Sequence, residues 1–181
     1  MTSKHAIHYS SKSAEHYTPK HVLDLVVECM GSIDLDPCSN SKADPNVPAA
    51  RHYTKEDDGL IQPWAGRAFM NPVYGREVGY WIRKLRSEHE AGRVTESITL
   101  VAARVDTAWW RALVAAELEI CPIWCAVKGR LTFGGNADPA QFPSALVYIG
   151  PDPGRFASVF QSLGTIWAPW TGHLRGSAPT E

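Results

Sequence analysis

The sequence predicts one α/β domain whose sheet is largely parallel and carries helices on both faces. Short apolar runs alternate with segments of helical periodicity, which is the order that βαβ units produce. The chain has 181 residues, 44% of them hydrophobic and 20% charged, as is typical of a globular protein with a single core. We expect a folded domain over residues 16–170, between flexible ends at residues 1–15 and 171–181.

The first predicted elements are a helix and a short strand. Thr18 and Pro19 are suited to begin a helix, because threonine can cap free amide groups and proline at the first helical position loses no hydrogen bond. Apolar residues then fall on one helical face until Gly31, which ends the helix. Residues 32–36 alternate apolar and polar side chains and stop at Pro37, which predicts a strand followed by a turn.

The middle of the chain predicts a second strand that delivers a tight turn. Residues 38–63 are rich in Asn, Asp, Ser and Pro and are expected to be mostly loop. The apolar run at residues 68–70 then leads directly into Asn71 and Pro72. An amphipathic helix is expected to follow over residues 77–90.

The rest of the chain continues the alternation. The expected elements are a strand at residues 97–101, a helix at 107–117, and strands at 118–126 and 144–149 that flank a glycine-rich segment at 129–135. In a sheet of βαβ units, ligands collect outside the carboxyl ends of the strands. Asp36 and residues 71–74 both emerge there, which predicts that they line one cleft.

Composition limits the classes of function. Lys and Arg number 18 against 19 Asp and Glu, so there is no global basic signature for nucleic-acid binding. No apolar stretch approaches the roughly 20 residues that cross a bilayer, and the start of the chain lacks the apolar core of a signal peptide. We therefore expect a cytoplasmic protein without a membrane partner. The four cysteines form no CxxC pair, and neither a disulfide nor a metal site is expected.

The tetrapeptide Asn71, Pro72, Val73 and Tyr74 carries groups suited to an exocyclic amino group of a base. Such a nitrogen is a poor nucleophile because its lone pair is delocalised into the ring. The Asn71 side-chain oxygen and the Pro72 carbonyl can accept hydrogen bonds from it and stabilise the positive charge of the transition state. Tyr74 offers an aromatic face on which a base extruded from a duplex can stack. The structural alternative is a turn that ends a strand and places a tyrosine in the core.

Several short segments, in a fixed order, resemble a known family. They are Tyr-Thr-Pro at residues 17–19, Ile-Asp-Leu-Asp-Pro at 33–37, Asp-Gly-Leu at 58–60 with Trp64, Phe-Met-Asn-Pro-Val-Tyr at 69–74, Ala-Ala-Arg-Val-Asp-Thr at 102–107 and Gly-Arg-Leu-Thr-Phe at 129–133. Together they resemble the phage and prophage DNA N6-adenine methyltransferases of the Dam-like class. The resemblance implies a Rossmann-like class I methyltransferase sheet, compact or trimmed, mostly parallel with an antiparallel C-terminal strand.

The resemblance also implies an activity. It is the transfer of methyl from S-adenosyl-L-methionine to N6 of adenine by direct attack of a flipped base, in the manner of a site-specific DNA methyltransferase. DNA is then the expected partner, and the cytoplasm of a bacterial or phage-infected cell is the expected location. The biological role would be either protection in a restriction-modification system or regulation. N4 methylation of cytosine, a small amine substrate such as a free nucleotide, and a methyltransferase-like nucleic-acid-binding module without activity stay open as alternatives.

Roles follow residue by residue. The predicted catalytic residues are Asn71, Pro72 and Tyr74. The resemblance implies cofactor contacts for Tyr17, Thr18, Pro19, Asp36, Pro37, Asp57 and Asp58. Predicted substrate contacts, from position and side-chain type, are Val73, Arg76, Arg104 and Arg130. The structural alternatives are a helix cap for the first group, a turn or solvated loop for the aspartates, and a solvated face or salt bridge for the arginines.

Some positions depart from the family pattern. Val73 stands where the family usually has a second proline, and Cys38-Ser39-Asn40 replaces the glycine-rich loop that follows the first strand. The interval between Asp36 and Asn71 is short, which predicts a trimmed sheet. No separate target-recognition domain fits, so readout is expected from loops such as residues 136–142 or from a second protomer in a homodimer.

Overall fold

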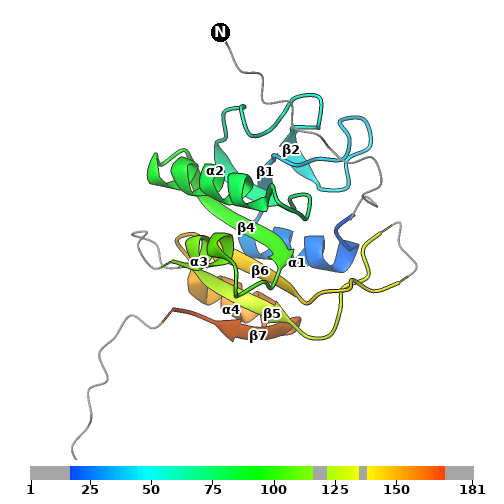
Figure 1. Ribbon diagram of the computed structural model, residues 1–181, viewed down its shortest axis with the longest axis vertical. Helices are drawn as coiled ribbons and strands as arrows, with labels where there is room; N and C mark the ends of the chain where they lie inside the picture. The colour runs from blue at the N-terminus through cyan, green and yellow to red at the C-terminus, as the bar shows by residue number, and fades with distance from the viewer. Residues whose placement is uncertain (1–16, 116–121, 135–137, 170–181) are drawn as a thin grey trace, which may run out of the picture.

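The computed structural model describes residues 17–115, 122–134 and 138–169, which form a mixed α/β fold around one sheet (Figure 1). The strands are β1 Ile33–Asp36, β2 Ala49–His52, β3 Gly66–Met70, β4 Val94–Ala102, β5 Ile123–Val127, β6 Ser144–Ile149 and β7 Gly164–Trp167. Their order in the sheet is β2-β1-β3-β4-β6-β5-β7. The helices are α1 Lys20–Met30, α2 Val78–Glu90, α3 Ala108–Val114 and α4 Pro153–Phe160.

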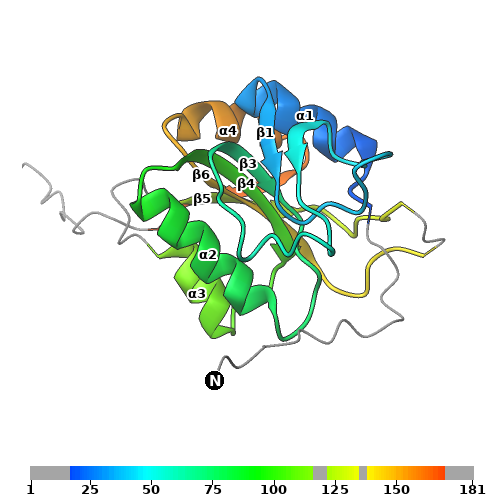
Figure 2. The ribbon, with the colours of Figure 1, turned by 90° about the horizontal axis from the view of Figure 1, so that it is seen from above.

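The helices cover both faces of the sheet, as predicted. Figure 2 shows α1 and α4 on one face and α2 and α3 on the other. The core under α1 and α4 includes Phe69 and Ile98, whereas the core under α2 and α3 includes Met70 and Val101. Successive residues of β3 thus point to opposite faces and into different cores, which is why its apolar run is continuous.

Strand direction divides the sheet into two halves. The pairs β1–β2, β1–β3 and β3–β4 are parallel, whereas β6 is antiparallel to both β4 and β5, and β7 is antiparallel to β5. The expected antiparallel C-terminal strand is present as β7, and β6 also runs against the other strands, so the antiparallel part is larger than expected. Since β5 is antiparallel to β6, it runs in the same direction as β4.

Several predicted elements are confirmed, with changed bounds. The strand at 144–149 is confirmed to the residue, and α2 lacks only the first residue of its prediction. The strand predicted at residues 118–126 corresponds to β5, which begins at Ile123. Residues 116–121, which belong to this prediction and to the helix predicted at 107–117, lie outside the described part. α4 and β7 have no counterpart in the predictions.

Although the described sheet has seven strands, the trimming that was expected of it is limited to the short interval between β1 and β3. Its described residues form loops and the four-residue strand β2, with no helix. β2 lies at one side of the sheet and is only partly buried, so this end of the sheet is thin.

The start of α1 differs from the prediction. Pro19, not Thr18, is the N-cap, and its carbonyl accepts hydrogen bonds from the Val22 and Leu23 amides at 2.9 and 3.2 Å. No side chain caps this helix. The Thr18 side chain does not cap α1; its hydroxyl instead accepts a hydrogen bond from the side chain of Asn71. Gly31 ends α1 with a φ of 78°, as its prediction requires.

Candidate active site at the carboxyl ends of the strands

Five strands of the described sheet end on the same side. Because β1, β2, β3, β4 and β5 run in one direction, the segments that follow them meet there. These segments contain residues 36–37, 71–74, 103–107 and 128–134. We call this side the carboxyl end of the sheet. The predicted convergence of Asp36 with the tetrapeptide on one side of the sheet agrees with this topology.

Asn71 follows β3 directly and is held by the segment that precedes α1. Its side-chain nitrogen Nδ2 donates a hydrogen bond to Oγ1 of Thr18 at 3.1 Å. Thr18 is 2% exposed, Asn71 is half-buried and Pro72 is buried. A residue of the predicted cofactor segment therefore contacts a predicted catalytic residue.

Residues 17–18 are fastened from two further sides. Tyr17 forms an antiparallel bridge with Gly134, whose amide donates to the Tyr17 carbonyl at 2.8 Å. A Cβ on Gly134 would lie 2.9 Å from Cβ of Tyr17, so this close approach requires glycine. Asn46 Nδ2 donates to the Thr18 carbonyl at 3.2 Å. The segment is thereby attached to the loops before β2 and after β5.

Tyr74 packs among aromatic rings. Its ring meets Phe142 edge-on at 4.9 Å between centroids, and Phe133 at 6.1 Å. Burial raises the pKa of its hydroxyl well above the usual range, so the group stays protonated. The contacts hold the ring in one orientation, while stacking of a base on its face stays a prediction. Phe142 belongs to the loop at residues 136–142 that was predicted to read the target sequence; it packs against Tyr74, residues 136 and 137 lie outside the described part, and readout by this loop stays a prediction.

Asp36 is a buried carboxyl group at the end of β1. It is 2% exposed, and its Oδ1 accepts a hydrogen bond from the Cys38 amide at 3.0 Å. Burial raises the pKa of Asp36 to about 6, although hydrogen bonds from the Cys38 amide and Ser39 and the nearby charge of His52 act in the opposite direction. The turn that was the structural alternative is present. The burial of its carboxyl group goes beyond what a turn requires.

Asp57 and Asp58 both shape their own loop. Asp57 accepts from Lys42 Nζ at 2.6 Å and from the Thr54 amide at 2.8 Å. The Lys42 hydrogen bond is the largest cause that lowers the pKa of Asp57 to about 2. Asp58 has a φ of 54°, and its Oδ1 accepts from the Leu60 amide at 3.2 Å. These contacts place the loop, and a cofactor contact by either residue stays a prediction.

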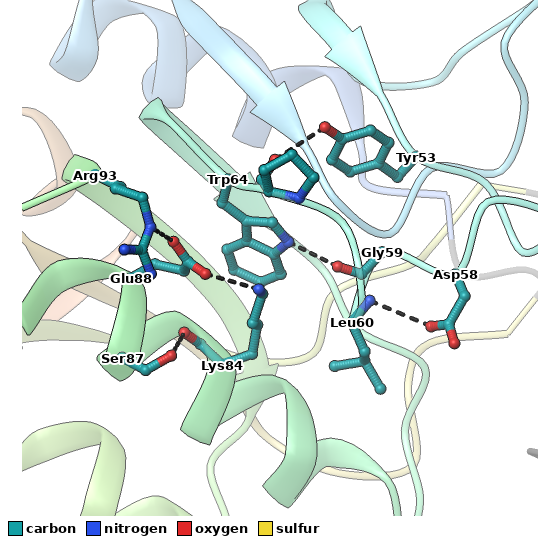
Figure 3. A network of polar contacts seen from close by, with 10 residues as sticks. Tyr53, Asp58, Gly59, Leu60, Trp64, Lys84, Ser87, Glu88 and Arg93 are labelled. Atoms are coloured by element: carbon teal, nitrogen blue, oxygen red, sulfur yellow. Dashed lines mark hydrogen bonds and ion pairs between the residues drawn. The ribbon is translucent and has the colours of Figure 1, made fainter. Parts of the chain in front are cut away.

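Gly59 locks this loop against the turn after β1. A Cβ at this position would lie 2.1 Å from the Pro37 carbonyl oxygen, so only glycine fits. The Gly59 carbonyl accepts from Nε1 of the fully buried Trp64 at 2.7 Å, and Nζ of Lys84 on α2 lies 5.9 Å from the Trp64 ring (Figure 3). The motif at residues 58–60 thus holds Asp57, Asp58 and Pro37 together, which its local sequence does not reveal.

The predicted substrate residues lie on the exposed loops of the carboxyl end. Val73 is 42% exposed, and the Arg104 side chain is 58% exposed with its Nε 3.5 Å from Asp106. Arg76 and Arg130 are exposed too, and no carboxylate of the described residues forms an ion pair with either. Three cationic side chains therefore lie on the loops that follow β3, β4 and β5.

The remaining described residues offer no metal site. No group of three or more potential ligands occurs among them, and the described thiols of Cys29, Cys38 and Cys125 form no disulfide. None of the described helices has the length and apolar character that a bilayer crossing requires.

Comparison with protein families identifies one match. The model described as DNA N-6-adenine-methyltransferase (Dam) matches residues 9–146. This stretch includes every residue that was predicted to bind or catalyse, from Tyr17 to Arg130. A search of curated proteins found no match.

Proposed function

Since the chain belongs to the DNA N-6-adenine-methyltransferase (Dam) family, we propose that it transfers methyl from S-adenosyl-L-methionine to N6 of adenine at a site built around Asn71. Family membership implies DNA adenine methyltransferase activity and a DNA substrate. The observation that carries the assignment of the site is the position of Asn71, at the carboxyl end of β3, fixed by Thr18 and beside the buried Asp36 turn. The fold that we assign is a compact, Rossmann-like class I methyltransferase sheet.

The donor and acceptor groups at this end fit the proposed cofactor. Its ammonium and ribose hydroxyls are hydrogen-bond donors, and the site supplies acceptors in the buried carboxyl of Asp36 and in the Asp58 carboxylate. Lys42 and Thr54 already engage Asp57, so we favour Asp58 of the two. S-adenosyl-L-methionine supplies a methyl group on a positively charged sulfur. Without a glycine-rich loop, the turn at residues 38–40 and the segment at 17–19 hold its methionine end.

The chemistry of the chain's own residues is hydrogen-bond acceptance. Asn71 Oδ1 and the Pro72 carbonyl take the two N–H groups of the target and keep its lone pair directed at the methyl carbon. The bound cofactor would supply the methyl group to this nitrogen and keep the electron pair of the broken carbon–sulfur bond, while the oxygens of Asn71 and Pro72 would stabilise the positive charge until the nitrogen releases one proton to water. Phe133 and Phe142 hold the Tyr74 ring as a platform for the flipped base. The exposed arginines Arg76, Arg104 and Arg130 contact phosphates.

The test is direct identification of the product. Protein, methyl-labelled cofactor and mixed DNA are incubated, and the nucleosides are separated by mass. We expect N6-methyladenine, with a rate that falls about 100-fold or more in Asn71→Ala. Gln161→Ala, an exposed amide after α4, is the matched control and should leave the rate unchanged. Labelled N4-methylcytosine would establish the alternative base.

A thermal melt separates an inactive binding module from an enzyme. Cofactor at a hundred times its dissociation constant should add about 2.7 kcal/mol to the free energy of unfolding. Stabilisation without methyl transfer to DNA would refute the DNA activity while leaving the cofactor site intact. No stabilisation would refute the cofactor assignment.

A further inference from the structure

We propose that Ser144 binds the target base, and that its hydroxyl donates a hydrogen bond to a ring nitrogen of adenine beside the exocyclic amino group. The proposal rests on the proposed function, which it extends from the amino group to the ring of the base. Ser144 is not among the residues that the sequence predicts to bind or catalyse.

Ser144 begins β6 at the carboxyl end of the sheet. It pairs with Ala102, the last residue of β4, and β6 runs antiparallel to β4. The Ala103 amide donates to the Pro143 carbonyl at 2.8 Å, so the backbone ladder continues beyond this pair. The start of β6 therefore lies on the same side of the sheet as the end of β3, from which Asn71 emerges.

The Ser144 side chain lies on the face of the sheet against which Tyr74 packs. Side chains alternate between the two faces of a strand, so Ser144 shares the face of Leu146 and Tyr148, which belong to the core under α1 and α4. The ring of Tyr74 packs against the same core. Phe142, two residues before Ser144, meets that ring at 4.9 Å between centroids. Ser144 therefore combines the end of the sheet and the face on which the candidate site lies.

The hydroxyl of Ser144 is buried without a partner. The residue is 1% exposed, and its Oγ has no hydrogen-bond partner among the described residues. A buried hydroxyl in this state costs free energy that an alanine of nearly the same size would avoid. An unsatisfied polar group of this kind is typical of a position where a ligand supplies the missing partner.

Thr99 on β4 shows that position matters as well as the missing partner. Its Oγ1 is also buried, and it too has no hydrogen-bond partner in the described part of the chain. Thr99 pairs with Met70 and Val147, which both belong to the core under α2 and α3. Its hydroxyl therefore lies on the opposite face from Ser144, within an apolar core, and Thr99 is a natural control.

A ring nitrogen of the target is the partner that the proposed reaction supplies. In adenine, N1 and N7 flank the amino group, and both accept hydrogen bonds without donating any. The two N–H groups of the amino nitrogen are assigned to Asn71 and Pro72, so donation to N1 or N7 is the bond that Ser144 can add. Because the Ser144 hydroxyl is covered in the free protein, the bond forms as the base displaces side chains that cover it.

The first test compares Ser144→Ala with Thr99→Val, which each remove one unpartnered hydroxyl. Neither variant should lower the melting temperature of the free protein, because no protein hydrogen bond is lost. We expect kcat/KM for DNA to fall about tenfold in Ser144→Ala and to stay unchanged in Thr99→Val. An unchanged rate in Ser144→Ala, or an equal loss in both variants, overturns the proposal. A lower melting temperature of Ser144→Ala, or its failure to fold, would reveal a structural role and overturns it too.

The second test identifies the atom of the base. Duplex pools are made in which 1-deazaadenine or 7-deazaadenine, each with one ring nitrogen replaced by C–H, takes the place of adenine. One analogue should lower kcat/KM about tenfold with the original protein and with Thr99→Val, but less than about twofold with Ser144→Ala. Since every protein meets the same DNA, effects of the analogue on the duplex cancel in this comparison. If each analogue lowers the rate equally in all three proteins, Ser144 does not contact N1 or N7.

A binding measurement separates this contact from the proposed function. The dissociation constants of the same labelled pools, measured by fluorescence anisotropy, should show the same dependence on Ser144 without any methyl transfer. If the original protein transfers no methyl but binding shows this dependence, the proposed function fails and the Ser144 contact stands. If methyl is transferred and neither rate nor binding shows it, the proposed function stands and the Ser144 contact is overturned.

Discussion

The two ends of the sheet each hold a buried carboxyl group, and the surroundings shift the pKa values of the two groups in opposite directions. At the carboxyl end, Asp36 is 2% exposed and receives hydrogen bonds from neutral donors, and burial raises its pKa to about 6. At the other end, Glu88 is equally buried but lies 2.5 Å from Arg93 Nε and 2.7 Å from Lys84 Nζ. The Arg93 hydrogen bond is the main cause that holds the pKa of Glu88 below its usual value.

The difference distinguishes a structural carboxyl group from a predicted ligand contact. Glu88 has its positive charges within the chain, so its ionised form stabilises the fold and joins α2 to the turn before β4. Asp36 lacks such a partner in the described structure apart from the weak field of His52. A buried carboxylate without a cation is a cost that a positively charged ligand can offset. The comparison therefore supports Asp36 as a ligand contact.

Asp36→Asn should remove the free-energy cost of the buried carboxylate, and it gives the largest expected effect on stability. Because the folded pKa of Asp36 is raised from 3.8 to about 6, its contribution is fully present below pH 3.8 and is lost as the pH rises through 6. At pH 8 the ionised group costs about 2–3 kcal/mol. The variant should lack this decline, so its melting temperature relative to the original protein rises between pH 5 and 8, while stabilisation by cofactor is reduced.

Asp34→Asn on the same strand is the matched control. Asp34 accepts from the Arg67 amide at 2.8 Å, which is the first cause that lowers its pKa. Its contribution is present above the ordinary pKa and lost in acid, so this variant should be destabilised at neutral pH. The same pH trend in both variants would contradict the assignment of the Asp36 effect to burial.

At the opposite end of the sheet, Glu88→Gln should lower the free energy of unfolding by about 1–2 kcal/mol at pH 7. The amide keeps the shape but loses the charge that binds Lys84 and Arg93, and both cations can reach solvent, which limits the loss. Denaturant unfolding measures the change. Stabilisation by cofactor should be unaffected, because the Glu88 carboxylate contacts Lys84 and Arg93 and no predicted cofactor residue. A matching loss of cofactor stabilisation would contradict the division between the two ends.

His89 gives the neighbouring region an acid sensitivity. Its Nε2 lies 2.8 Å from Ser97 Oγ, and burial lowers the pKa of His89 from 6.5 to about 4. Since the unfolded chain takes up this proton first, the contribution is present above pH 6.5 and is lost as the pH falls toward 4. We expect about 1–2 kcal/mol, allowing for partial exposure. The melting temperature of His89→Gln should fall less steeply between pH 7 and 4.5 than that of the original protein. If the two melting temperatures fall in parallel, His89 is excluded as the cause.

The sequence predicts what depends on neighbours in the chain and misses what depends on distant ones. Periodicity and apolar runs located β6, α2 and the end of β3 because each buries a face set by its own side chains. The same local reasoning assigned Thr18 to a helix cap, whereas its partner Asn71 is 53 residues away. Two further features also depend on residues that are distant in the chain. They are the approach of Gly59 to Pro37 and the position of β6 between β4 and β5. The catalytic residues were predicted from their chemistry and the cofactor residues from a family resemblance, whereas the contacts of all of them follow only from the fold.

The two ends of α2 allow the smallest predicted effect to be tested with a matched pair of arginines. In its first half, Arg83 lies 4.7 Å from the ring of the 56% exposed Tyr80, and no described carboxylate forms an ion pair with it. Just beyond its other end, Arg93 binds Glu88. An exposed arginine without an ion pair, on the half of α2 that follows the tetrapeptide, is suited to a phosphate contact, whereas an arginine paired with Glu88 is not.

Arg83→Gln should therefore weaken DNA binding about threefold to tenfold, and Arg93→Gln should leave it unchanged. Because each phosphate contact releases bound counterions, the slope of log K against log salt should decrease by about 1 in Arg83→Gln alone. Fluorescence anisotropy with a labelled duplex at several salt concentrations measures both quantities. Equal weakening by the two variants would indicate a diffuse charge effect, and it would remove Arg83 from the DNA-binding surface. A change confined to Arg83 would extend that surface from the loops of the carboxyl end onto the first turns of α2.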